Sequence, residues 1–259
     1  MLISITFFIL YILIIGTLLI VGFLPTRSNS RIDNSETLKL SQLTVIIPFR
    51  NEKENLPFLI SSINRQSIQP VQFIFVNDHS DDDGPSLLLS HKNEKFRCID
   101  LPKDVKGKKR AIRFAIDFVK TEYVLTLDAD VELSEHYFSK IEKLPISDML
   151  ILPVHMKGDS FLQLMSSIDI VLVNAINEGI SRVSRPVLAS GANLLFKVKV
   201  FQEVSTTTNL EVSSGDDIFL LKDFRDAGRE IQLNSDKELA VTTMAPKSLK
   251  ELLSQRVRW

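Results

Sequence analysis

Two aspartates separated by one residue end an apolar run in the middle of the chain. In YVLTLDADVEL, residues 123–133, apolar and β-branched side chains favour a strand, and Asp128 and Asp130 follow it with only Ala129 between them. Carboxylates at the carboxyl end of a buried strand lie where open α/β sheets bind their ligands. Such a pair can hold a hard divalent cation, Mg²⁺ or Mn²⁺, against the phosphates of a substrate. The alternative interpretation is an acidic loop that turns into solvent.

Acidic residues also follow two other predicted strands. Residues 43–47 are an apolar run, as in a strand buried on both faces, and we expect Pro48 to end it and Glu52 to lie on the loop beyond. Residues 73–76 predict a second strand, with Asp78 just after it. We therefore expect Glu52, Asp78 and the aspartate pair to face one rim of the sheet. A helix cap at Glu52 and an Asx turn at Asp78 are the alternatives.

A basic segment precedes the aspartate strand. The stretch KDVKGKKRAIRFAIDFVK, residues 103–120, predicts a basic loop and then a helix with apolar side chains along one side. Its lysines, Lys108 among them, could form a solvated face, the usual position of a charge run. Lysines and acids at one rim also fit a nucleotide diphosphate with a metal. The chain has neither GxxxxGK[ST] nor GxGxxG, which excludes a P-loop and the common dinucleotide site.

The order of these segments and the composition indicate the fold class. Helical periods cover 54–66 and 85–91, and 96–101 predicts another strand, so strands and helices alternate as in βαβ units. We expect an α/β fold with a mainly parallel sheet flanked by helices. The net charge of −1 excludes a general nucleic-acid binder. A single cysteine, Cys98, excludes an intrachain disulfide and fits a reducing compartment.

The first 24 residues contain no charged side chain and are long enough to cross a bilayer. A cleaved signal peptide would need a basic start and a small-residue cleavage site, so we expect a retained transmembrane anchor. Arg27 and Arg31 follow this segment and no basic residue precedes it, which predicts a membrane protein with a single span and its remainder in the cytoplasm. Residues 25–41 predict a polar linker, and 42–259 the globular domain.

The second half offers three more features. Residues 161–180 are too polar for a comfortable span and predict a core or membrane-surface helix. Gly191, among small and polar neighbours, permits close approach of a ligand to the backbone, and a strand with a glycine bulge is the alternative. Asp216 and Asp217 precede an apolar run and could simply be helix-start acids favoured by the helix dipole.

Together these motifs resemble the family 2 glycosyltransferases, which have a GT-A fold. The segment VIIPFRNEKENL, residues 45–56, is similar to the opening strand and loop of that family. VNDHSDD, residues 76–82, is similar to its VDDGSxD motif, and LTLDADVEL, residues 125–133, to its DxD strand. The resemblance extends from about residue 43 to 259. Asn77 and His79 depart from the second motif, whereas Asp78 keeps its acid.

The resemblance implies roles for individual residues. Those expected to bind the nucleotide part of the donor are Pro48, Glu52, Asp78, Lys108 and Asp128. Glu52 and Asp78 would hold the uridine, and Asp128 would face the ribose. Asp130 would bind the metal. The segment GDD matches the ED motif of the family, so Asp217 would be the general base, which burial can tune toward its working range.

Further residues would contact the sugar or the acceptor. These are Gly191, Ala192, Asn193, Asp216, Gln255, Arg258 and Trp259. The last three match the QxxRW motif of cellulose, chitin and hyaluronan synthases and ceramide glucosyltransferases; there an indole can form a floor for a sugar ring and an arginine can hold a diphosphate. A terminal amphipathic helix is the alternative. Because transmembrane helices follow this motif in those relatives, we expect the sequence to be part of a longer protein.

The resemblance thus implies a membrane-anchored, inverting, metal-dependent glycosyltransferase. It would move a sugar from a nucleotide-diphosphate donor, a UDP-sugar, to a hydroxyl group of a glycan or lipid acceptor. Two other hypotheses stay open. A polyprenyl-phosphate sugar transferase of similar fold normally lacks QxxRW. A non-catalytic, membrane-tethered sugar-nucleotide binder would keep the pocket but lose the base, and here Asp217 and Asp130 are present.

Overall fold

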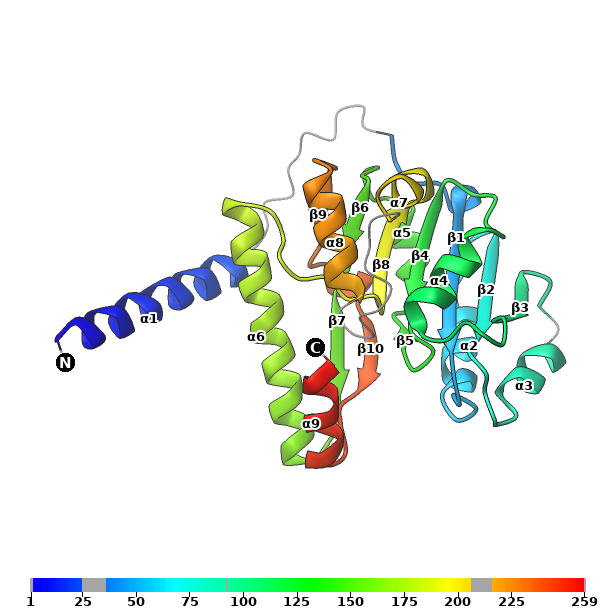
Figure 1. Ribbon diagram of the computed structural model, residues 1–259, viewed down its shortest axis with the longest axis horizontal. Coiled ribbons are helices and arrows are strands. Elements are labelled where there is room, and N and C mark those ends of the chain that lie inside the picture. Colours follow the sequence, from blue (N-terminus) through cyan, green and yellow to red (C-terminus); the bar gives the residue numbers. More distant parts are fainter. Residues whose placement is uncertain (1, 25–35, 92, 206–215, 259) are drawn as a thin grey trace.

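The main body of the protein is a three-layer α/β domain built on one large sheet (Figure 1). The computed structural model describes residues 2–24, 36–91, 93–205 and 216–258. The strands of this sheet, in spatial order, are β3 (Phe96–Asp100), β2 (Gln72–Asn77), β1 (Leu43–Phe49), β4 (Tyr123–Leu127), β8 (Asn193–Lys197), β6 (Met149–Ile151) and β9 (Ile231–Leu233). All neighbours in it are parallel except β8, which runs antiparallel to β4 and β6. The predicted α/β class and mainly parallel sheet are confirmed.

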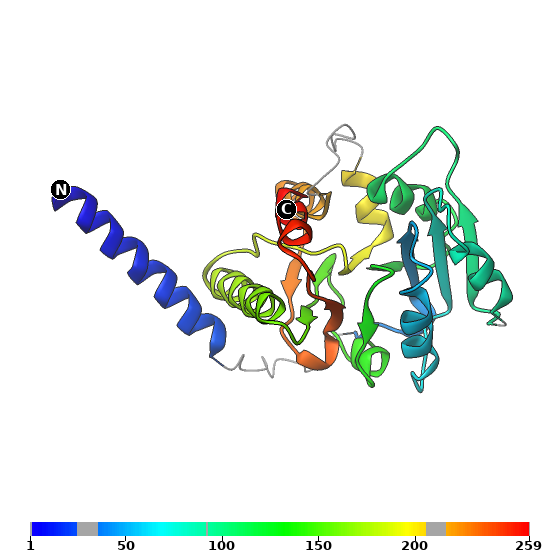
Figure 2. The ribbon, with the colours of Figure 1, turned by 90° about the horizontal axis from the view of Figure 1, so that it is seen from below.

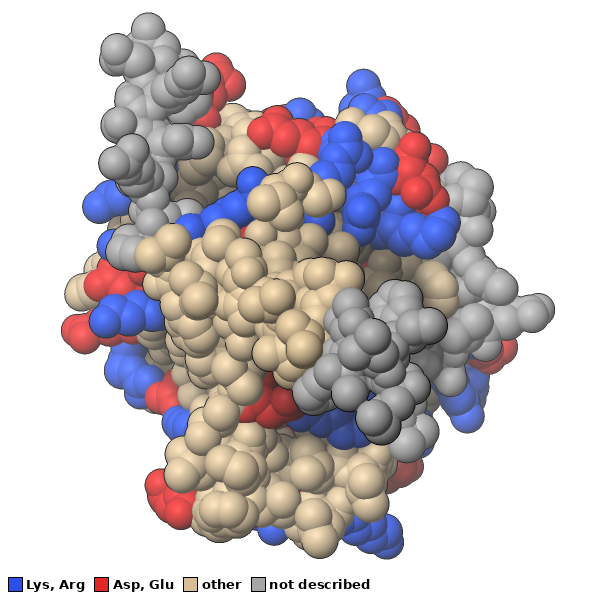
Figure 3. Space-filling view, turned by 90° about the vertical axis from the view of Figure 1, so that its left-hand side faces the viewer, with Lys and Arg blue, Asp and Glu red and all other residues tan. Residues whose placement is uncertain are grey.

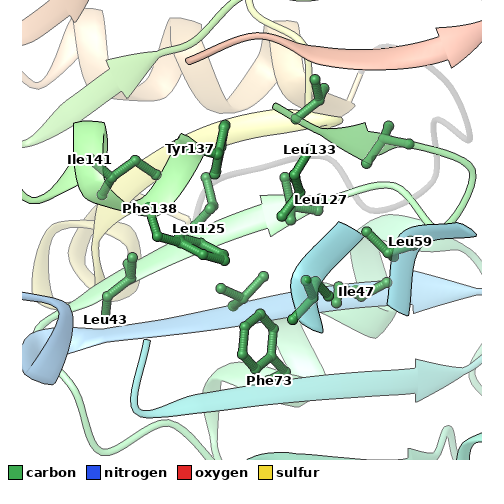
Figure 4. Close-up of a cluster of buried hydrophobic side chains, with 14 of the residues drawn as sticks. Leu43, Ile47, Leu59, Phe73, Leu125, Leu127, Leu133, Tyr137, Phe138 and Ile141 are labelled. Atoms are coloured by element: carbon green, nitrogen blue, oxygen red, sulfur yellow. The ribbon is translucent and has the colours of Figure 1, made fainter. Parts of the chain in front are cut away.

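Helices cover both faces of this sheet. One face packs against α2 (Leu56–Asn64), α3 (Gly84–Ser90) and α5 (Tyr137–Ile141), and the other against α4 (Lys108–Ile116), α7 (Val198–Val204) and α8 (Asp216–Asp226). Alternate residues of β1 point to opposite faces of the sheet, and a hydrophobic core cluster lies on each face. Ile47 belongs to the first cluster, part of which Figure 4 shows, and Ile46 belongs to the second. A strand buried on both faces therefore reads as an unbroken apolar run.

The strand β1 continues through Pro48 instead of ending there. Pro48 pairs with Val76 of β2, and β1 extends to Phe49. Pairing of β1 with β4 ends earlier, at Ile46 opposite Thr126. A proline removes one N–H donor, which a strand tolerates where one neighbour no longer pairs with it.

A second, smaller sheet and two helices lie at one end of the main sheet. The small sheet is β5 (Glu132–Leu133), β10 (Val241–Met244) and β7 (Val154–Lys157). Beside it runs α6 (Phe161–Val183), whose first turn is closed by a capping box between Ser160 and Gln163. An ion pair between Arg256 and Asp169 fastens α9 (Leu249–Arg258) to α6, and the two helices lie side by side in Figures 1 and 2.

The N-terminal helix α1 (Leu2–Phe23) crosses α6 at very close range. A Cβ atom at Gly22 would lie 1.9 Å from the carbonyl oxygen of Ala175, and one at Gly179 would lie 2.2 Å from that of Leu18. The surface seen from the α1 side has a broad uncharged centre (Figure 3). Among the described residues no helix has both the length and the apolar character needed to cross a membrane. The prediction of a single N-terminal span with a cytoplasmic remainder is therefore wrong. In the structure α1 packs against α6.

The predicted linker, residues 25–41, is only partly described. Residues 25–35 lie outside the described part of the chain. The remainder packs on the domain: Thr37 forms a bridge with Pro145, and Leu38 and Leu40 are buried in the first core cluster. The globular domain therefore begins several residues before position 42.

Candidate functional site

A cavity of about 780 Å³ opens at the edge of the main sheet where β1, β2, β4, β6 and β9 end. The predicted site residues that line it are Pro48, Glu52, Asp78, Lys108, Asp128, Asp130, Gly191, Asp217 and Gln255. They come from segments that are far apart in the sequence, and the parallel strands bring them to one rim. The cavity is within the usual size range of ligand sites.

Two loops are tied together at one end of the cavity. The backbone N–H of Asn51 donates to Ser80 Oγ at 3.0 Å, and Asn51 Oδ1 accepts from the N–H of Asp81 at 2.7 Å. Asn51 adopts a left-handed backbone (φ 55°), which asparagine tolerates better than most residues. These bonds hold the loop that carries Glu52 against the loop that carries Asp78.

Asp78 is buried and only half satisfied. Its Oδ2 atom accepts a hydrogen bond of 2.9 Å from the N–H of Gly107, whose φ of +100° favours glycine. Its Oδ1 atom is buried without a hydrogen-bond partner among the described residues. His79 Nε2 is 4.0 Å from this oxygen and is engaged with the Val105 carbonyl at 2.9 Å. A buried orphan acceptor calls for a donor, and an N–H group of a bound ligand would supply one.

Lys108 lies at the centre of the site. Its Nζ atom forms an ion pair with Asp128 Oδ1. Burial lowers the pKa of Lys108, but the carboxylate of Asp128, with smaller contributions from Asp217 and Asp130, outweighs burial and raises this pKa overall. Lys108 is therefore cationic at neutral pH. A Cβ atom at Gly191 would lie 3.3 Å from Nζ, so the absence of a side chain there makes room for the lysine.

Two carboxylates of the site are held in unfavourable surroundings. Burial, together with the nearby charge of Asp128, raises the pKa of Asp130, and Thr243 Oγ1 donates to Asp130 Oδ2 at 2.9 Å. Burial likewise raises the pKa of Glu52, and a hydrogen bond of 2.6 Å from Asn55 Nδ2 offsets part of that shift. Because both carboxylates are destabilised in their charged form, a cation bound between them would be stabilising.

Asp217 lies between the acidic rim and the far side of the cavity. Its Oδ2 atom accepts from the N–H of Gly191 at 3.0 Å, and its Oδ1 atom accepts from the N–H of Ile218 at 2.9 Å. The loop that carries Gly191 is itself fixed by Asn177 of α6, whose Oδ1 atom accepts from the N–H of Val187 at 2.9 Å. Two backbone donors thus orient the carboxylate toward the cavity that it lines.

Asn193, a predicted sugar or acceptor contact, faces the core instead. Its side chain is fully buried and accepts a hydrogen bond from the Tyr137 hydroxyl through Oδ1. Its Nδ2 atom donates to the carbonyls of Pro153 and Leu239 at 2.8 and 2.9 Å. Neither Asn193 nor Ala192 lines the cavity. Asn193 joins the main sheet to the segment before β10.

The C-terminal motif is described only in part. Gln255 on α9 lines the cavity, and its Oε1 atom is buried without a hydrogen-bond partner among the described residues. The predictions for Asp216, Arg258 and Trp259 concern side chains that lie outside the described part of the chain. Their roles stay predictions.

Two functional neighbours were missed by the sequence analysis. Thr243 touches Asp130 across a sequence separation of 113 residues, and Asn177 holds the Gly191 loop from inside an otherwise apolar helix. No spacing rule links Thr243 to the aspartates. The amide of Asn177 within the apolar period of α6 was a usable signal, because a polar side chain in a buried helix face needs partners.

Residues 44–145 match the family model described as glycosyl transferase family 2. This segment is similar to the glycosyl transferase family 2 domain, and the match covers less than half of the chain. The matched residues contain Pro48, Glu52, Asp78, Lys108 and both aspartates of the DxD strand, which is the end of the cavity expected to bind a donor. The family predicted from the motifs is thereby confirmed.

Two relatives and one solved structure show what the chain is similar to. It is 32% identical to the teichoic acid poly(glycerol phosphate) polymerase of Staphylococcus epidermidis over 45% of this chain and 16% of that protein. It is 34% identical to the undecaprenyl-phosphate 4-deoxy-4-formamido-L-arabinose transferase of Yersinia enterocolitica over 38% of this chain and 32% of that protein. The alignments thus cover less than a third of either relative.

The solved structure is a mannosyltransferase from Pyrobaculum calidifontis in complex with GDP-Man and Mn²⁺. It superposes with a TM-score of 0.66 at 16% identity, over 97% of this chain and 70% of that one. A likeness at this identity shows the fold alone. The described domain therefore has the GT-A-like architecture that the motifs predicted.

Proposed function

We propose that this protein is an inverting glycosyltransferase that uses a nucleotide-diphosphate sugar, a UDP-sugar in the first instance. The proposal rests on one observation: Asp78, the Lys108–Asp128 pair, Asp130 and Asp217 line the same cavity. The match of residues 44–145 to the family model supports it. The proposed catalytic unit is residues 42–259, with the packed segment 36–41.

The donor would lie along the sheet edge from β2 to β4. The unpaired Oδ1 of Asp78 can accept the imide N–H of a uracil ring. The ammonium of Lys108 can leave Asp128 for the diphosphate, because both partners are anionic and the site is partly shielded from water. Glu52 and Pro48 form the adjoining wall.

The residues present fit a divalent cation, Mg²⁺ or Mn²⁺, at Asp130. Asp130 and Asp128 offer hard oxygen ligands, and a bound cation would offset the burial and the Asp128 charge that raise the pKa of Asp130. Among the described residues no group of three or more His, Cys, Asp and Glu could hold a metal by itself. Mg²⁺ is usually held by one or two carboxylates plus substrate phosphates. When bound, the cation would stabilise negative charge on the departing diphosphate as a Lewis acid.

Transfer would be a single displacement. Asp217 takes the proton of the acceptor hydroxyl, and the oxygen attacks the anomeric carbon from the face opposite the diphosphate. The bond from that carbon to the diphosphate oxygen breaks, and the electron pair leaves with the nucleotide diphosphate. Lys108 balances the charge that remains there. The backbone N–H groups of Gly191 and Ile218 keep Asp217 in position.

A donor screen tests this proposal. Purified protein is incubated with UDP- and GDP-sugars and Mn²⁺ or Mg²⁺, and released nucleotide diphosphate is measured; we expect release with a UDP-sugar and its loss on chelation. A nucleotide diphosphate that binds without any turnover, in wild type and in Asp217→Asn alike, would favour the non-catalytic binder. No binding of any nucleotide diphosphate with metal would contradict the proposal.

A further inference from the structure

The cavity continues past Asp217 into an apolar arm, which we define by Val154, Ile170, Val173, Leu188, Ile218 and Leu233. These residues belong to α6, α8, β7, β9 and the loop before β8. In the order of the main sheet, β6 and β9 lie on the opposite side of β8 from β1 and β2. The arm is therefore distinct from the donor end, and Asp217 lies where the two meet.

Four polar side chains beside the arm each make at least one hydrogen bond within the protein. Asn177 Oδ1 accepts from the N–H groups of Val187 and Leu188, and its Nδ2 atom donates to the Leu188 carbonyl, with distances of 2.8 to 3.1 Å. Ser235 Oγ donates to the buried Glu178 Oε2 at 2.7 Å, and Asn174 Nδ2 donates to the Val154 carbonyl at 3.2 Å. Asn234 Oδ1 accepts from the N–H of Asp236 at 2.8 Å.

A glycan in the arm would need hydrogen-bond partners for each hydroxyl that leaves water, since an unpaired buried hydroxyl is costly. The four polar side chains named above direct at least one hydrogen-bonding atom at the protein's own backbone or at Glu178, and Asn177 is engaged through both of its side-chain atoms. A hydrocarbon chain has no such requirement and gains from contact with the apolar lining. The arm matches a hydrocarbon better than a sugar chain.

We propose that the acceptor of this transferase is amphipathic: its hydroxyl lies at Asp217 and its hydrocarbon chain occupies the apolar arm. Asp217 and Ile218 are consecutive residues of α8 and both line the cavity, so the proposed base and the arm share one helix end. The cavity volume of about 780 Å³ belongs to both ends together, which leaves room for a donor and the head of such an acceptor. This inference rests on the proposed function and narrows its acceptor class from a glycan or lipid to a lipid.

The test measures binding of simple alcohols by calorimetry with UDP and Mn²⁺ present. The probes are 1-hexanol, 1-octanol and 1-decanol, with cellotriose as the glycan probe. Burial of one methylene contributes about 0.8 kcal/mol, so the Kd should fall by up to about fourfold for each added methylene until the arm is full. Kd values that do not depend on chain length, or tighter binding of cellotriose than of 1-decanol, would overturn the proposal.

Paired substitutions on α6 locate the binding site. Val173 lines the arm, whereas Val171 is 42% exposed on the same helix and is not part of the cavity lining. Val173→Asn places an amide against the chain and should weaken 1-decanol binding about tenfold, a typical cost of a poorly paired buried amide. Val171→Asn should change the Kd by less than twofold. Ile218→Asn is the second arm variant, used if thermal melts show that Val173→Asn does not fold.

The readouts separate this inference from the proposed function. UDP affinity should be the same in wild type and in all three variants, because the substitutions lie outside the donor end. Normal UDP binding with equal effects of Val171→Asn and Val173→Asn would show that the hydrocarbon chain does not bind in the apolar arm. That result would not contradict the proposed transferase activity. The protein could instead bind the alcohols as expected but bind no nucleotide diphosphate. That result would contradict the proposed donor and would still support a hydrocarbon site in the apolar arm.

Discussion

The contact between Gly191 and Lys108 gives a graded test of the donor end. A Cβ atom at Gly191 would meet Lys108 Nζ at 3.3 Å, Lys108 Cε at 3.5 Å and Asp217 Cβ at 3.7 Å. The nearest of these atoms is the end of a flexible side chain, so Gly191→Ala should fold normally while Nζ retreats by a few tenths of an ångström. Gly191→Val adds two more carbons and should drive the lysine out of its position.

Coulomb's law converts these displacements into affinities. Lys108 is 38% exposed, which calls for an effective dielectric constant of about 20. An ammonium about 4 Å from a phosphate charge then contributes roughly 4 kcal/mol to the binding free energy of UDP. A retreat of about 0.4 Å removes roughly 0.4 kcal/mol, a twofold change in Kd, and a retreat of about 2 Å removes roughly 1.4 kcal/mol, a tenfold change.

Calorimetry of UDP with Mn²⁺ measures both changes. We expect Kd to rise about twofold in Gly191→Ala and about tenfold or more in Gly191→Val, in line with these Coulomb energies. Gly16→Ala, at a position in α1 with no atom within 4 Å of the new Cβ, is the matched control and should leave Kd unchanged. A folded Gly191→Val protein whose UDP affinity stays within twofold of wild type would show that Lys108 does not bind the diphosphate.

Three other substitutions test separate parts of the site. Asp217→Asn should lower turnover about 10²–10⁴-fold with little change in UDP affinity, since a general base acts on the acceptor alone; steady-state rates and calorimetry would expose a misassigned base. Asp130→Asn should abolish metal-dependent turnover yet raise the Tm of the ligand-free protein at pH 7, by roughly 2–4 °C for about 1 kcal/mol. Burial raises the pKa of Asp130 above its value in the unfolded chain, so ionising Asp130 destabilises the folded state at pH 7 but not below the unfolded pKa of about 4. The gain in Tm from Asp130→Asn should therefore be larger at pH 7 than at a pH below that value. Asn193→Ala removes the partner of the Tyr137 hydroxyl and of the Leu239 carbonyl, whereas the Pro153 carbonyl keeps the N–H of Val241; Tm should fall by roughly 6–12 °C for about 3 kcal/mol, while UDP affinity measured below the transition stays normal.

Buried parallel strands made much of the fold predictable. The segments 43–47, 73–76 and 96–101 were expected as strands and correspond to β1, β2 and β3 within about two residues. Both faces of β1 and β2 are covered, so their sequences are nearly continuous apolar runs with clear ends, whereas the edge strand β3 is only partly buried. The acids that follow such runs then had to lie at one rim, and the cavity contains them.

Short or isolated elements gave no such signal. β5 has two residues and pairs with β10 more than a hundred residues later, so the contact of Thr243 with Asp130 had no local signature. Leu38 and Leu40 sit in a polar stretch that resembles a linker, and only their burial shows that they belong to the domain. Asn193 suits a ligand contact and a core hydrogen bond equally, and its orientation decides between them.

The donor end lacks partners for several of its charged and polar groups, and a nucleotide diphosphate together with a divalent cation would supply them. Asp78 holds a buried oxygen without a described donor, and burial raises the pKa of both Glu52 and Asp130. Lys108 is the cation that partly balances this group of acids, through Asp128. A uracil N–H would satisfy Asp78, and a divalent cation would relieve the crowded carboxylates while the diphosphate engages Lys108. Each partner removes a penalty that the free protein carries, so UDP and Mn²⁺ should bind with positive coupling, each tightening the other by the same factor.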